Sequence, residues 1–553
     1  MITSSFINDT IYSHIEHTKL EAYLLQSKIV SRLQFITQNA LAYFAFPSIN
    51  TKRYIHSIGT MHIASHMYKS ALLNANKTLR NKFLKELYTA IKKIEPDAKS
   101  SKVIQKSDFF EDDTLYQFLI PLRDEKEKYA YLLSLEAIRV AALLHDVGHF
   151  PFSHQVEYAM ESLYEKYAKT KEKNTKESKF IEFYELLTNK NNLVLHEAMG
   201  LEFTKMLFEY EVPSFLPKKT DKEYVKVVYK LAYFILEDKV FEGFDFGVIH
   251  SIINSTVDAD RLDYINRDML SSGYIGGAVD LLRIAKQAVL TSAKEAYTIS
   301  FFDNAILDIE HMLEMRFNLY KKVIFNHQIA KKDAMLENLI VHLVKEYFNE
   351  PKNKKTNNIS MLWNFLKEKE SEKRLDTISL LDENWLISLF KEDYFNLKYS
   401  QKTEKEKVLM IFEEVLFGKK YFNSIWKNLN DLYGVLGFTT KEKYQFRESF
   451  GYITPSKLIL LKNALDNFIA LYEKKNKNLF FSYQIVSFKL GVSKDFCLFN
   501  NESLVTIDEI STLRKRLKKS MQNTVPFFLY CNQKELSEPM REDLKEILIS
   551  VFK

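Results

Sequence analysis

The sequence predicts a mostly α-helical protein with a small α+β portion near its C-terminus. Only 13 glycines and 10 prolines occur among 553 residues, and this composition favours long helices over a turn-rich sheet architecture. Apolar residues recur at helical spacing, for example at Leu458, Leu461, Leu465 and Phe468. Segments 480–488 and 525–530 are instead aromatic and β-branched, which is typical of strands.

The chain is too long for one hydrophobic core, so two or three domains are expected. Residues 349–358 are polar and contain a proline, and we place a linker there between a core of residues 1–348 and a C-terminal region of residues 359–553. Within the core, residues 164–178 are crowded with Lys, Glu, Thr and Asn. They should form an exposed loop or charged helix inserted into the core.

Charge and cysteine content narrow the class of protein. The net charge of +6 arises from 78 Lys and Arg against 72 Asp and Glu, too small an excess to argue for nucleic-acid binding. A basic run at 514–519 is better explained as a solvated helix face. The two cysteines, Cys497 and Cys531, argue against a disulfide framework and for a reducing compartment. Without a signal peptide or a run of 18 apolar residues, we expect a cytoplasmic protein and no membrane partner.

The most informative residues are His145 and Asp146. They follow a stretch, 135–144, that is apolar apart from Glu136 and Arg139 and therefore predicts a buried helix. Burying an imidazole and a carboxylate is costly unless a metal or charged partner compensates. A lone histidine is more often a satisfied core residue, so further ligands must be found elsewhere.

Two other segments offer such ligands. His56 begins an apolar-periodic helix, and residues 258–268 contain four acids and two arginines in a helical pattern. Two imidazoles with two carboxylates suit iron, manganese, magnesium, zinc or nickel, and they leave coordination positions open for water and substrate. Open positions indicate a catalytic metal rather than a structural one.

With these motifs the chain resembles the HD-domain phosphohydrolases, and within them the deoxynucleoside triphosphate (dNTP) triphosphohydrolases. The resemblance covers about the first 345 residues, in family order. It rests on segments 8–11, 32–38, 46–47, 53–57, 145–154, 196–197, 258–268 and 316–320. The family's metal pattern maps onto His56, His145, Asp146 and Asp260, which implies one divalent metal per site; a second Mg²⁺ could accompany the triphosphate.

The resemblance also implies a reaction. In this family water attacks the α-phosphorus of a dNTP and releases a deoxynucleoside and intact triphosphate. His154 corresponds to the acid that protonates the 5′ oxygen, and Glu157, where the family has Asp, would orient it. His149 and His196 correspond to the remaining active-site histidines. Residues matching substrate contacts are Arg53 and Arg261 for the phosphates, Gln38, Tyr264 and Asp268 for the sugar, and Arg316.

Several nearby residues have simpler explanations. Asp263 and Arg267, spaced i and i+4, are most simply an ion pair on the helix surface, so we leave both out of the site. Asp258 could be a helix N-cap, with Asp260 the ligand by family register. His62 and His66 share a helical face with His56, but we expect both to be solvated.

Two other functions compete with a dNTP triphosphohydrolase. One is an HD phosphohydrolase acting on another nucleotide, such as a cyclic dinucleotide or an alarmone. The set of Gln38, Tyr264 and Asp268, which recognises a deoxyribose in the family, disfavours it. The other is a nucleotide-sensing regulator or a single-stranded nucleic-acid binder, which would not need a complete set of ligands and acid. Nucleotide housekeeping and dNTP depletion in antiphage defence would use the same site.

Regulation is where the sequence departs from mammalian members of the family. Those enzymes read a guanine activator with an aspartate and an arginine, and the register places Gln26 and Gln34 there. An amide donates as well as accepts, so strict guanine selection should be lost. A nucleotide activator therefore need not carry guanine. We also expect a homo-oligomer, which could be a dimer, tetramer or hexamer. Its C-terminal region should make oligomer or regulatory contacts.

Overall fold

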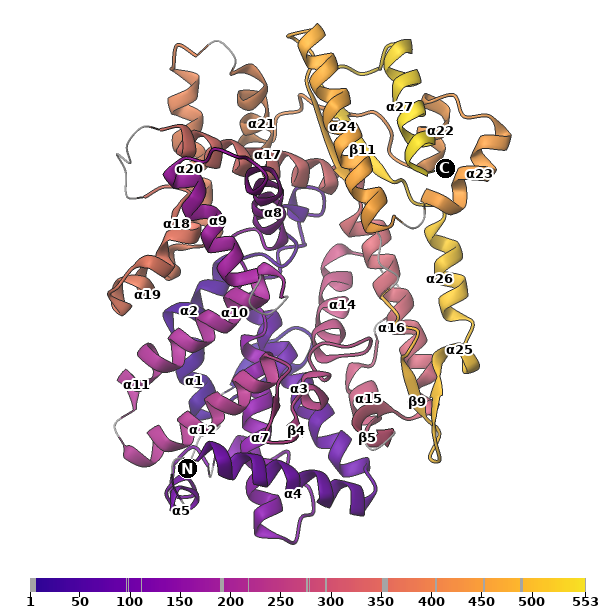
Figure 1. Ribbon diagram of the computed structural model, residues 1–553. Coiled ribbons are helices and arrows are strands. Elements are labelled where there is room, and N and C mark those ends of the chain that lie inside the picture. Colours follow the sequence, from indigo (N-terminus) through magenta and orange to yellow (C-terminus); the bar gives the residue numbers. More distant parts are fainter. Residues whose placement is uncertain are drawn as a thin grey trace.

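The computed structural model describes residues 6–95, 97, 99–110, 112–188, 193–216, 218–274, 277, 279–293, 296–350, 357–402, 405–450, 453–487 and 491–552. Most of these residues are helical, and the paired strands form small antiparallel sheets. The predicted mostly α fold with a small α+β portion is therefore confirmed. In Figure 1 the C-terminal helices α22 to α27 gather at one side of the molecule.

The first 350 residues supply the helices that carry the site. Those up to the HD motif are α1 (Lys19–Gln26), α2 (Lys28–Ser31), η1 (Arg32–Phe35), η2 (Ala42–Phe44), α3 (Arg53–Asn74), α4 (Lys77–Ile94), α5 (Ser100–Ile104), α6 (Asp113–Tyr116) and α7 (Glu125–Leu144). Those after it are α8 (His154–Ala168), α9 (Thr175–Thr188), α10 (Leu195–Met206), η3 (Leu207–Glu211), α11 (Val212–Phe215), α12 (Lys219–Leu236), α13 (Gly247–His250), α14 (Ala259–Ser272), α15 (Leu281–Lys286), η4 (Asp303–Ala305), α16 (Ile306–Leu319), η5 (Tyr320–Ile324) and α17 (His327–Asn349).

Helix α7 lies at the centre of this part. From Tyr129 to Leu144 every side chain is buried, which is expected for a helix packed on all sides. It contacts α3, α4 and α12, and α3 in turn contacts α14 and α15. The predicted buried helix before the HD motif is confirmed, and its C-terminal end lies where α3 and α14 meet.

The region beyond α17 is helical and then mixed, as expected. Its helices are α18 (Met361–Asn364), η6 (Phe365–Lys367), α19 (Ser371–Leu380), α20 (Glu383–Lys398), α21 (Glu406–Phe417), α22 (Leu429–Val435), α23 (Thr440–Phe450), α24 (Pro455–Lys475), α25 (Ile507–Ile510), α26 (Leu513–Met521) and α27 (Glu538–Phe552). Helix α17 contacts α8 of the core as well as α21, β8 (Phe481–Ile485) and β11 (Phe527–Cys531), so it joins the two regions.

Five small sheets occur among the described residues. They are β1 (Phe6–Asp9) with β2 (Ser13–Glu16), β3 (Val240–Phe241) with β4 (Phe244–Asp245), β5 (Ala288–Ala293) with β6 (Ala296–Phe301), β9 (Cys497–Phe499) with β10 (Leu504–Thr506), and β7 (Asn423–Ser424), β11 (Phe527–Cys531) and β8 (Phe481–Ile485) in the order β7-β11-β8. Strand β8 lies within the predicted segment 480–488, and β11 overlaps the predicted segment 525–530 and extends one residue beyond it. The two strands pair with each other, for example Leu529 with Tyr483.

Two predicted segments and the membrane expectation can be compared with the described residues. The charged segment 164–178 holds the end of α8, residues 169–174 and the start of α9, with mostly exposed side chains. The proposed linker begins at the last residue of α17, but residues 351–356 lie outside the described residues, as does Phe488; the domain boundary stays a prediction. None of the described helices is long and apolar enough to cross a membrane.

A buried ion pair fixes α7 against the N-terminal helices. The guanidinium of Arg139 donates to both oxygens of Glu21, at 2.6 and 2.7 Å, and to Ser65 Oγ on α3 at 2.7 Å. Glu21 also closes a capping box with Thr18 at the start of α1. One carboxylate thus joins α1 to α7, and Arg139 extends the link to α3.

We expect Glu21→Ala to lower the free energy of unfolding by about 3–5 kcal/mol, because Arg139 would remain buried without its partner. Urea unfolding followed by circular dichroism measures this change. Asp376→Ala is the matched control, since its ion pair with Lys28 is exposed and such pairs stabilise little. Equal destabilisation by both variants would contradict the role given to the buried pair.

Candidate metal centre and active site

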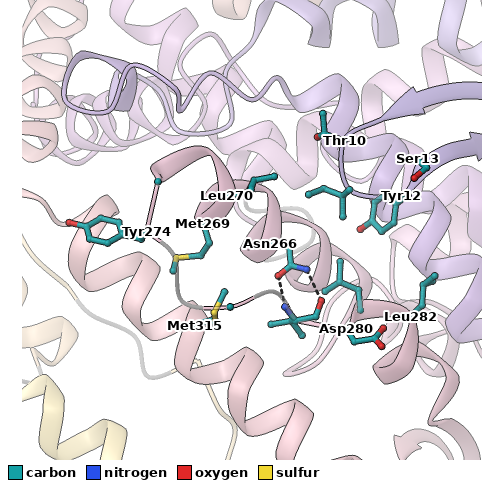
Figure 2. Close-up of a pocket in the computed structure, with 15 residues that line it drawn as sticks. Thr10, Tyr12, Ser13, Asn266, Met269, Leu270, Tyr274, Asp280, Leu282 and Met315 are labelled. Carbon is teal, nitrogen blue, oxygen red and sulfur yellow. Dashed lines mark hydrogen bonds between the residues drawn. The ribbon is translucent and has the colours of Figure 1, made fainter.

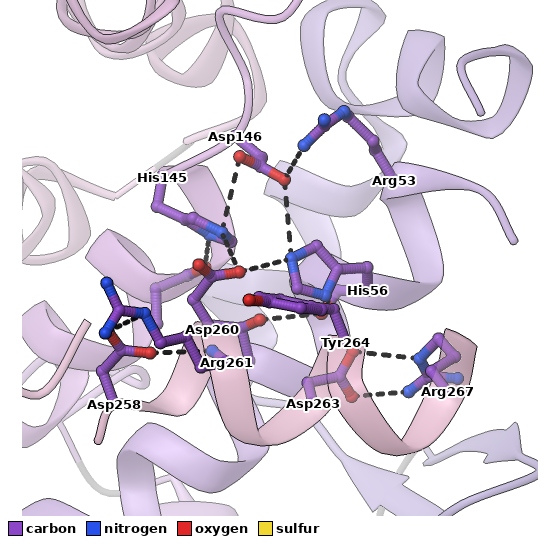
Figure 3. A network of polar contacts seen from close by, with 12 residues as sticks. Arg53, His56, His145, Asp146, Asp258, Asp260, Arg261, Asp263, Tyr264 and Arg267 are labelled. Atoms are coloured by element: carbon purple, nitrogen blue, oxygen red, sulfur yellow. Dashed lines mark hydrogen bonds and ion pairs between the residues drawn. The ribbon is translucent and has the colours of Figure 1, made fainter. Parts of the chain in front are cut away.

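Two histidines and two carboxylates from three helices face one another (Figure 3). His56 lies in the first turn of α3, His145 caps the C-terminus of α7, Asp146 follows it, and Asp260 lies in the first turn of α14. His56 Nε2 is 3.0 Å from Asp260 Oδ1 and 3.5 Å from Asp146 Oδ2. His145 Nε2 is 3.5 Å from Asp146 Oδ1 and 3.7 Å from Asp260 Oδ1. The structure thus brings all four predicted ligands together.

The hydrogen bonds behind the two rings suit a metal. His56 Nδ1 is held by Asp263 Oδ2 at 2.8 Å and His145 Nδ1 by the Ala142 carbonyl at 2.7 Å. Both Nε2 atoms are buried and lack a well-aligned hydrogen-bond partner among the described residues. With Nδ1 as the donor, Nε2 presents its lone pair toward the carboxylates, which is how imidazole ligates a metal.

The carboxylates around His56 and His145 favour a positive charge between them. Burial alone would lower the pKa of His56, but hydrogen bonds and charge from Asp260 and Asp263 outweigh it and raise the pKa to about 10. The set of His56, His145 and Asp260 offers ligand atoms within 4.8 Å of one another, and Asp146 contacts it through both oxygens. These residues fit a divalent cation.

The ion pair of Asp263 with Arg267 is not on the helix surface, and that expectation is wrong. The pair exists at 2.7 Å, but Asp263 is fully buried and Arg267 nearly so. Asp263 also accepts from His56 and from the hydroxyl of Tyr12, at 2.9 Å, while Arg267 donates to Asp9 at 2.8 Å. Asp263 therefore orients a candidate metal ligand. In the sequence, the i+3 spacing of Asp263 from Asp260 indicated that both carboxylates lie on the same face of the helix.

Two glycines allow the close packing that this network needs. A Cβ on Gly59 of α3 would lie 1.9 Å from Asp263 Oδ1. A Cβ on Gly148, three residues after His145, would lie 2.1 Å from the His196 carbonyl and 2.2 Å from the Gly200 nitrogen. The first contact admits Asp263 behind His56. The second brings α10, and with it His196, against the turn that follows the HD pair.

A second group of imidazoles surrounds Glu157. His154 Nδ1 and His196 Nδ1 lie 3.1 and 2.9 Å from Glu157 Oε2. Burial would raise the pKa of Glu157, but its hydrogen bonds to His154 and His196 hold that pKa well below the usual range. His149 stacks on His196 at 4.2 Å, and its Nε2 is 3.2 Å from Asp146 Oδ1. The predicted catalytic residues thus lie together, next to the metal ligands.

The turn between the two groups is strained and held in place. Phe152 and Ser153 have φ values of 58° and 56°, which non-glycine residues rarely adopt without support. Arg53 Nε donates to Ser153 Oγ at 2.7 Å, Ser153 Oγ donates to the Thr37 carbonyl at 2.6 Å, and Arg53 Nη1 pairs with Asp146. Arg53, predicted to bind phosphate, is buried and positions both His154 and Asp146.

Of the remaining basic residues, Arg261 lies on α14 and Arg316 lies on α16, which contacts α14. Arg316 Nε donates to the Tyr264 hydroxyl at 2.9 Å, and its guanidinium lies against Gly491 of the C-terminal region, where a Cβ would be 1.7 Å from Nη1. Arg261 Nη1 donates to the Thr256 carbonyl at 3.0 Å. Asp258 accepts from the Arg261 backbone nitrogen at 2.7 Å and is therefore the N-cap of α14, as its sequence allowed.

Gln38 and Asp268 carry unsatisfied oxygens. Gln38 Oε1 and Asp268 Oδ1 are buried and have no hydrogen-bond partner among the described residues. Burial raises the pKa of Asp268 to about 6, and Asn39, next to Gln38, moderates that rise. These oxygens are available to a bound molecule. His62 and His66 are half-buried rather than solvated, and burial lowers the pKa of His62 to about 3.

A cavity of about 550 Å³ is lined in part by Tyr12, whose hydroxyl donates to Asp263 (Figure 2). Its wall is largely apolar. It is lined by Thr10, Ile11, Tyr12, Ser13, Asn266, Met269, Leu270, Gly273, Tyr274, Gly277, Val279, Asp280, Leu281, Leu282 and Met315. Asn266 does not face it freely, because its amide bonds both the carbonyl and the nitrogen of Val279. Among the predicted site residues, none lines this cavity.

Residues 122–210 match the HD domain family, so the chain carries an HD domain. The matched range contains the HD pair and all four residues predicted to act in catalysis. His56 and Asp260 lie outside it, contributed by helices that precede and follow. The HD match therefore covers two of the four candidate metal ligands. The other two are brought to the site by the fold.

Relatives by sequence are distant. An uncharacterized protein of Methanocaldococcus jannaschii is 24% identical over 340 residues, 62% of this chain and 50% of that protein. A deoxynucleoside triphosphate triphosphohydrolase SAMHD1 homolog of Dictyostelium discoideum is 21% identical over 331 residues, 60% of this chain and 47% of that protein. The SAMHD1 enzyme of Bos taurus is 22% identical over 330 residues, 59% of this chain and 45% of that protein. The matched part spans about half the length of these relatives.

Solved structures share the fold over nearly the whole chain. A phosphohydrolase from Bacteroides thetaiotaomicron has a TM-score of 0.55 at 16% identity, covering 95% of this chain and 99% of that one. A hypothetical protein from Aquifex aeolicus gives 0.54 at 16% identity, covering 98% and 100%. Together with the HD domain, the sequence relatives support a metal-dependent phosphohydrolase.

We expect Asp263→Asn to weaken metal binding by about 10- to 100-fold, because residues that orient metal-ligating histidines have effects of this size. Equilibrium dialysis against Mn²⁺ with metal analysis measures the affinity. Asp9→Asn is the matched control, since it weakens the same Arg267 network without touching His56. Unchanged affinity in Asp263→Asn, or an equal loss in Asp9→Asn, would contradict the role of Asp263.

Proposed function

We propose that the protein is a metal-dependent dNTP triphosphohydrolase that releases a deoxynucleoside and inorganic triphosphate. One observation carries the proposal: the candidate metal ligands and the neighbouring group of histidines meet at Asp146, whose Oδ1 lies 3.5 Å from His145 Nε2 and 3.2 Å from His149 Nε2. A cation site beside a proton donor is what hydrolysis of a phosphoester requires. When bound, a divalent cation supplies Lewis-acid stabilisation of the phosphoryl group and activation of water.

His154 and Glu157 would carry out the proton transfer. When His154 is protonated on both ring nitrogens, Glu157 accepts from Nδ1 and the proton on Nε2 can pass to the departing 5′ oxygen. The longer side chain of Glu, compared with the Asp of the family, reaches His196 as well as His154. His154 is the most accessible of these rings, with its side chain 45% exposed, which suits a group that must reach the substrate.

Recognition of the substrate follows from the same site. Arg53, Arg261 and Arg316 place three guanidinium groups around the metal centre and Tyr264, where they would attract a triphosphate. The unsatisfied oxygens of Gln38 and Asp268 can accept from a 3′ hydroxyl. The ring of Tyr264, 6.4 Å from that of His56, would lie beneath the ribose, where a 2′ hydroxyl would clash.

The basic run at 514–519 supports nucleic-acid binding less well than the candidate metal centre supports hydrolysis. On α26, Arg514 pairs with Asp508, and Arg516 lies 3.1 Å from Glu314 and 3.7 Å from Glu310. Two of the cations in this run are therefore already paired with acids of the same chain. A solvated helix face remains the better explanation.

The proposal is tested by incubating purified protein with Mn²⁺ and each dNTP or NTP, singly and in pairs, and separating the products by chromatography. We expect deoxynucleoside and triphosphate from dNTPs and little reaction with NTPs. Asp146→Ala, which removes a ligand, should be inactive under the same conditions. Hydrolysis of a cyclic dinucleotide or alarmone, with no reaction of any dNTP, would contradict the proposal.

His154→Ala should lower kcat by about 100- to 10,000-fold, the usual contribution of a general acid, while the Mn²⁺ held by His56, His145, Asp146 and Asp260 stays at the wild-type level. Single-turnover rates and metal analysis measure the two quantities. Tyr158→Phe is the control, because Tyr158 lies beside His154, with ring centroids 6.1 Å apart, and only its hydroxyl is removed. A wild-type rate in His154→Ala, or pyrophosphate and a nucleoside monophosphate as primary products, would argue against this assignment.

Any nucleotide activator should not have to carry guanine. Gln26 ends α1 and Gln34 lies in η1, both exposed, and neither supplies the charge that selects guanine in mammalian relatives. We expect sigmoidal kinetics and a change in assembly state with a non-guanine dNTP, measured by rate assays and light scattering. Activity that appears only when GTP is added would show this expectation to be wrong.

A further inference from the structure

A short segment of the C-terminal region lies on two of the arginines proposed to bind the triphosphate. Residues 491–493 come after β8 and before β9 in the chain. The Gly491 carbonyl accepts from Arg261 Nη1 at 3.4 Å, and the Gly491 backbone lies against the guanidinium of Arg316. We refer to residues 491–493 as the strap.

The contact with Arg316 leaves no room for a side chain on the strap. A Cβ on Gly491 would lie 1.7 Å from Arg316 Nη1, 2.6 Å from Cζ and 3.3 Å from Nη2. Gly491 also has a φ of 76°, which disfavours other residues at this position. The same guanidinium donates from Nε to the Tyr264 hydroxyl and lies 4.7 Å from the centre of the Tyr320 ring. Arg316 is therefore held by α14, η5 and the strap together.

Thr256 connects the strap to Arg261. The Thr256 hydroxyl accepts from the Ser493 backbone nitrogen at 3.3 Å, and the Thr256 carbonyl accepts from Arg261 Nη1 at 3.0 Å. The two hydrogen bonds of the strap, at 3.3 and 3.4 Å, are at the long end of the usual range. The close packing of Gly491 on Arg316 is therefore the stronger constraint.

The residues that follow the strap anchor it on the core. The Cys497 carbonyl in β9 accepts from Ser300 Oγ in β6 at 2.8 Å, and the two strands contact each other. Farther along, Arg516 of α26 lies 3.1 Å from Glu314 of α16, the helix that carries Arg316. Figure 1 shows α26 beside α16. The strap is thus attached to the same part of the core as the arginines it contacts.

We propose that the strap is a positioning element, which holds the guanidinium groups of Arg261 and Arg316 in the orientation in which they bind the triphosphate. The inference rests on the proposed function, which takes both arginines as phosphate ligands. Fixing a long side chain before the substrate arrives lowers the entropy cost of binding. Planar guanidinium donors must also be oriented to bind phosphate oxygens in pairs. The C-terminal region thereby contributes to substrate affinity without donating a phosphate ligand of its own.

Gly491→Ala tests the proposal in the full-length protein with Mn²⁺ and inorganic triphosphate as the ligand. The added methyl group should displace the Arg316 guanidinium and weaken binding at least about tenfold, since a hydrogen bond to a charged group contributes about that much. Isothermal titration calorimetry measures the dissociation constant. Gly418→Ala is the matched control, because Gly418 has a φ of 68° but no described atom lies within 4 Å of its Cβ position. This control should bind triphosphate as the wild type does.

A double-mutant cycle with Arg316→Lys separates positioning from general damage to the fold. Lysine lacks the planar guanidinium that Gly491 accommodates, so Gly491→Ala should weaken binding less than about twofold in the Arg316→Lys background. A loss of stability would instead weaken binding equally in both backgrounds. If Gly491→Ala does not fold, Thr256→Val removes the hydroxyl that binds Ser493, and it should weaken binding about threefold.

The positioning role would be overturned by unchanged affinity in Gly491→Ala, by an equal loss in both backgrounds, or by unchanged affinity in Thr256→Val where that variant is used. Tighter binding would show that the strap covers the arginines instead of positioning them. A wild-type protein that does not bind triphosphate would also refute the inference. Hydrolysis of dNTPs is measured separately. If hydrolysis is absent while Gly491→Ala weakens triphosphate binding, the proposed function fails and the role of the strap stands.

Discussion

The contact between α3 and α14 is the constraint on which the rest of the site depends. It buries Asp263 against Gly59, where no side chain larger than hydrogen fits, and the carboxylate holds His56 from behind. Arg267, Asp9 and Tyr12 neutralise and orient that carboxylate in turn. A buried negative charge is stable only with such partners. The N-terminal hairpin β1–β2 and the turn that joins its strands thus contribute to a ligand more than forty residues away.

The second constraint lies at the turn after α7. Gly148 lets α10 approach so closely that the His196 carbonyl occupies the space of a side chain, and Arg53 secures the strained residue Ser153. His149, His154 and His196 therefore converge although they come from three different elements. Asp146 contacts both groups of histidines, so its position couples the metal centre to the residues proposed for proton transfer.

Much of this structure could be predicted from local patterns in the sequence. The apolar run before His145 predicted a buried helix, Asp258 could be read as an N-cap, and the aromatic segments predicted β8 and β11. The ligand types also indicated a metal, and the family resemblance supplied their register. The burial of Asp263 could not be predicted from its i+4 spacing to Arg267, because it depends on Gly59, some two hundred residues earlier. The face it shares with Asp260 on α14 was the only local sign.

We propose that water attacks the α-phosphorus of a dNTP at the centre formed by His56, His145, Asp146 and Asp260. Hydrolysis in ¹⁸O-labelled water, followed by mass spectrometry of the products, identifies the atom that is attacked. We predict one ¹⁸O atom in the inorganic triphosphate and none in the deoxynucleoside. Label in a nucleoside monophosphate, in single phosphate or in the sugar hydroxyl would show that another atom is attacked.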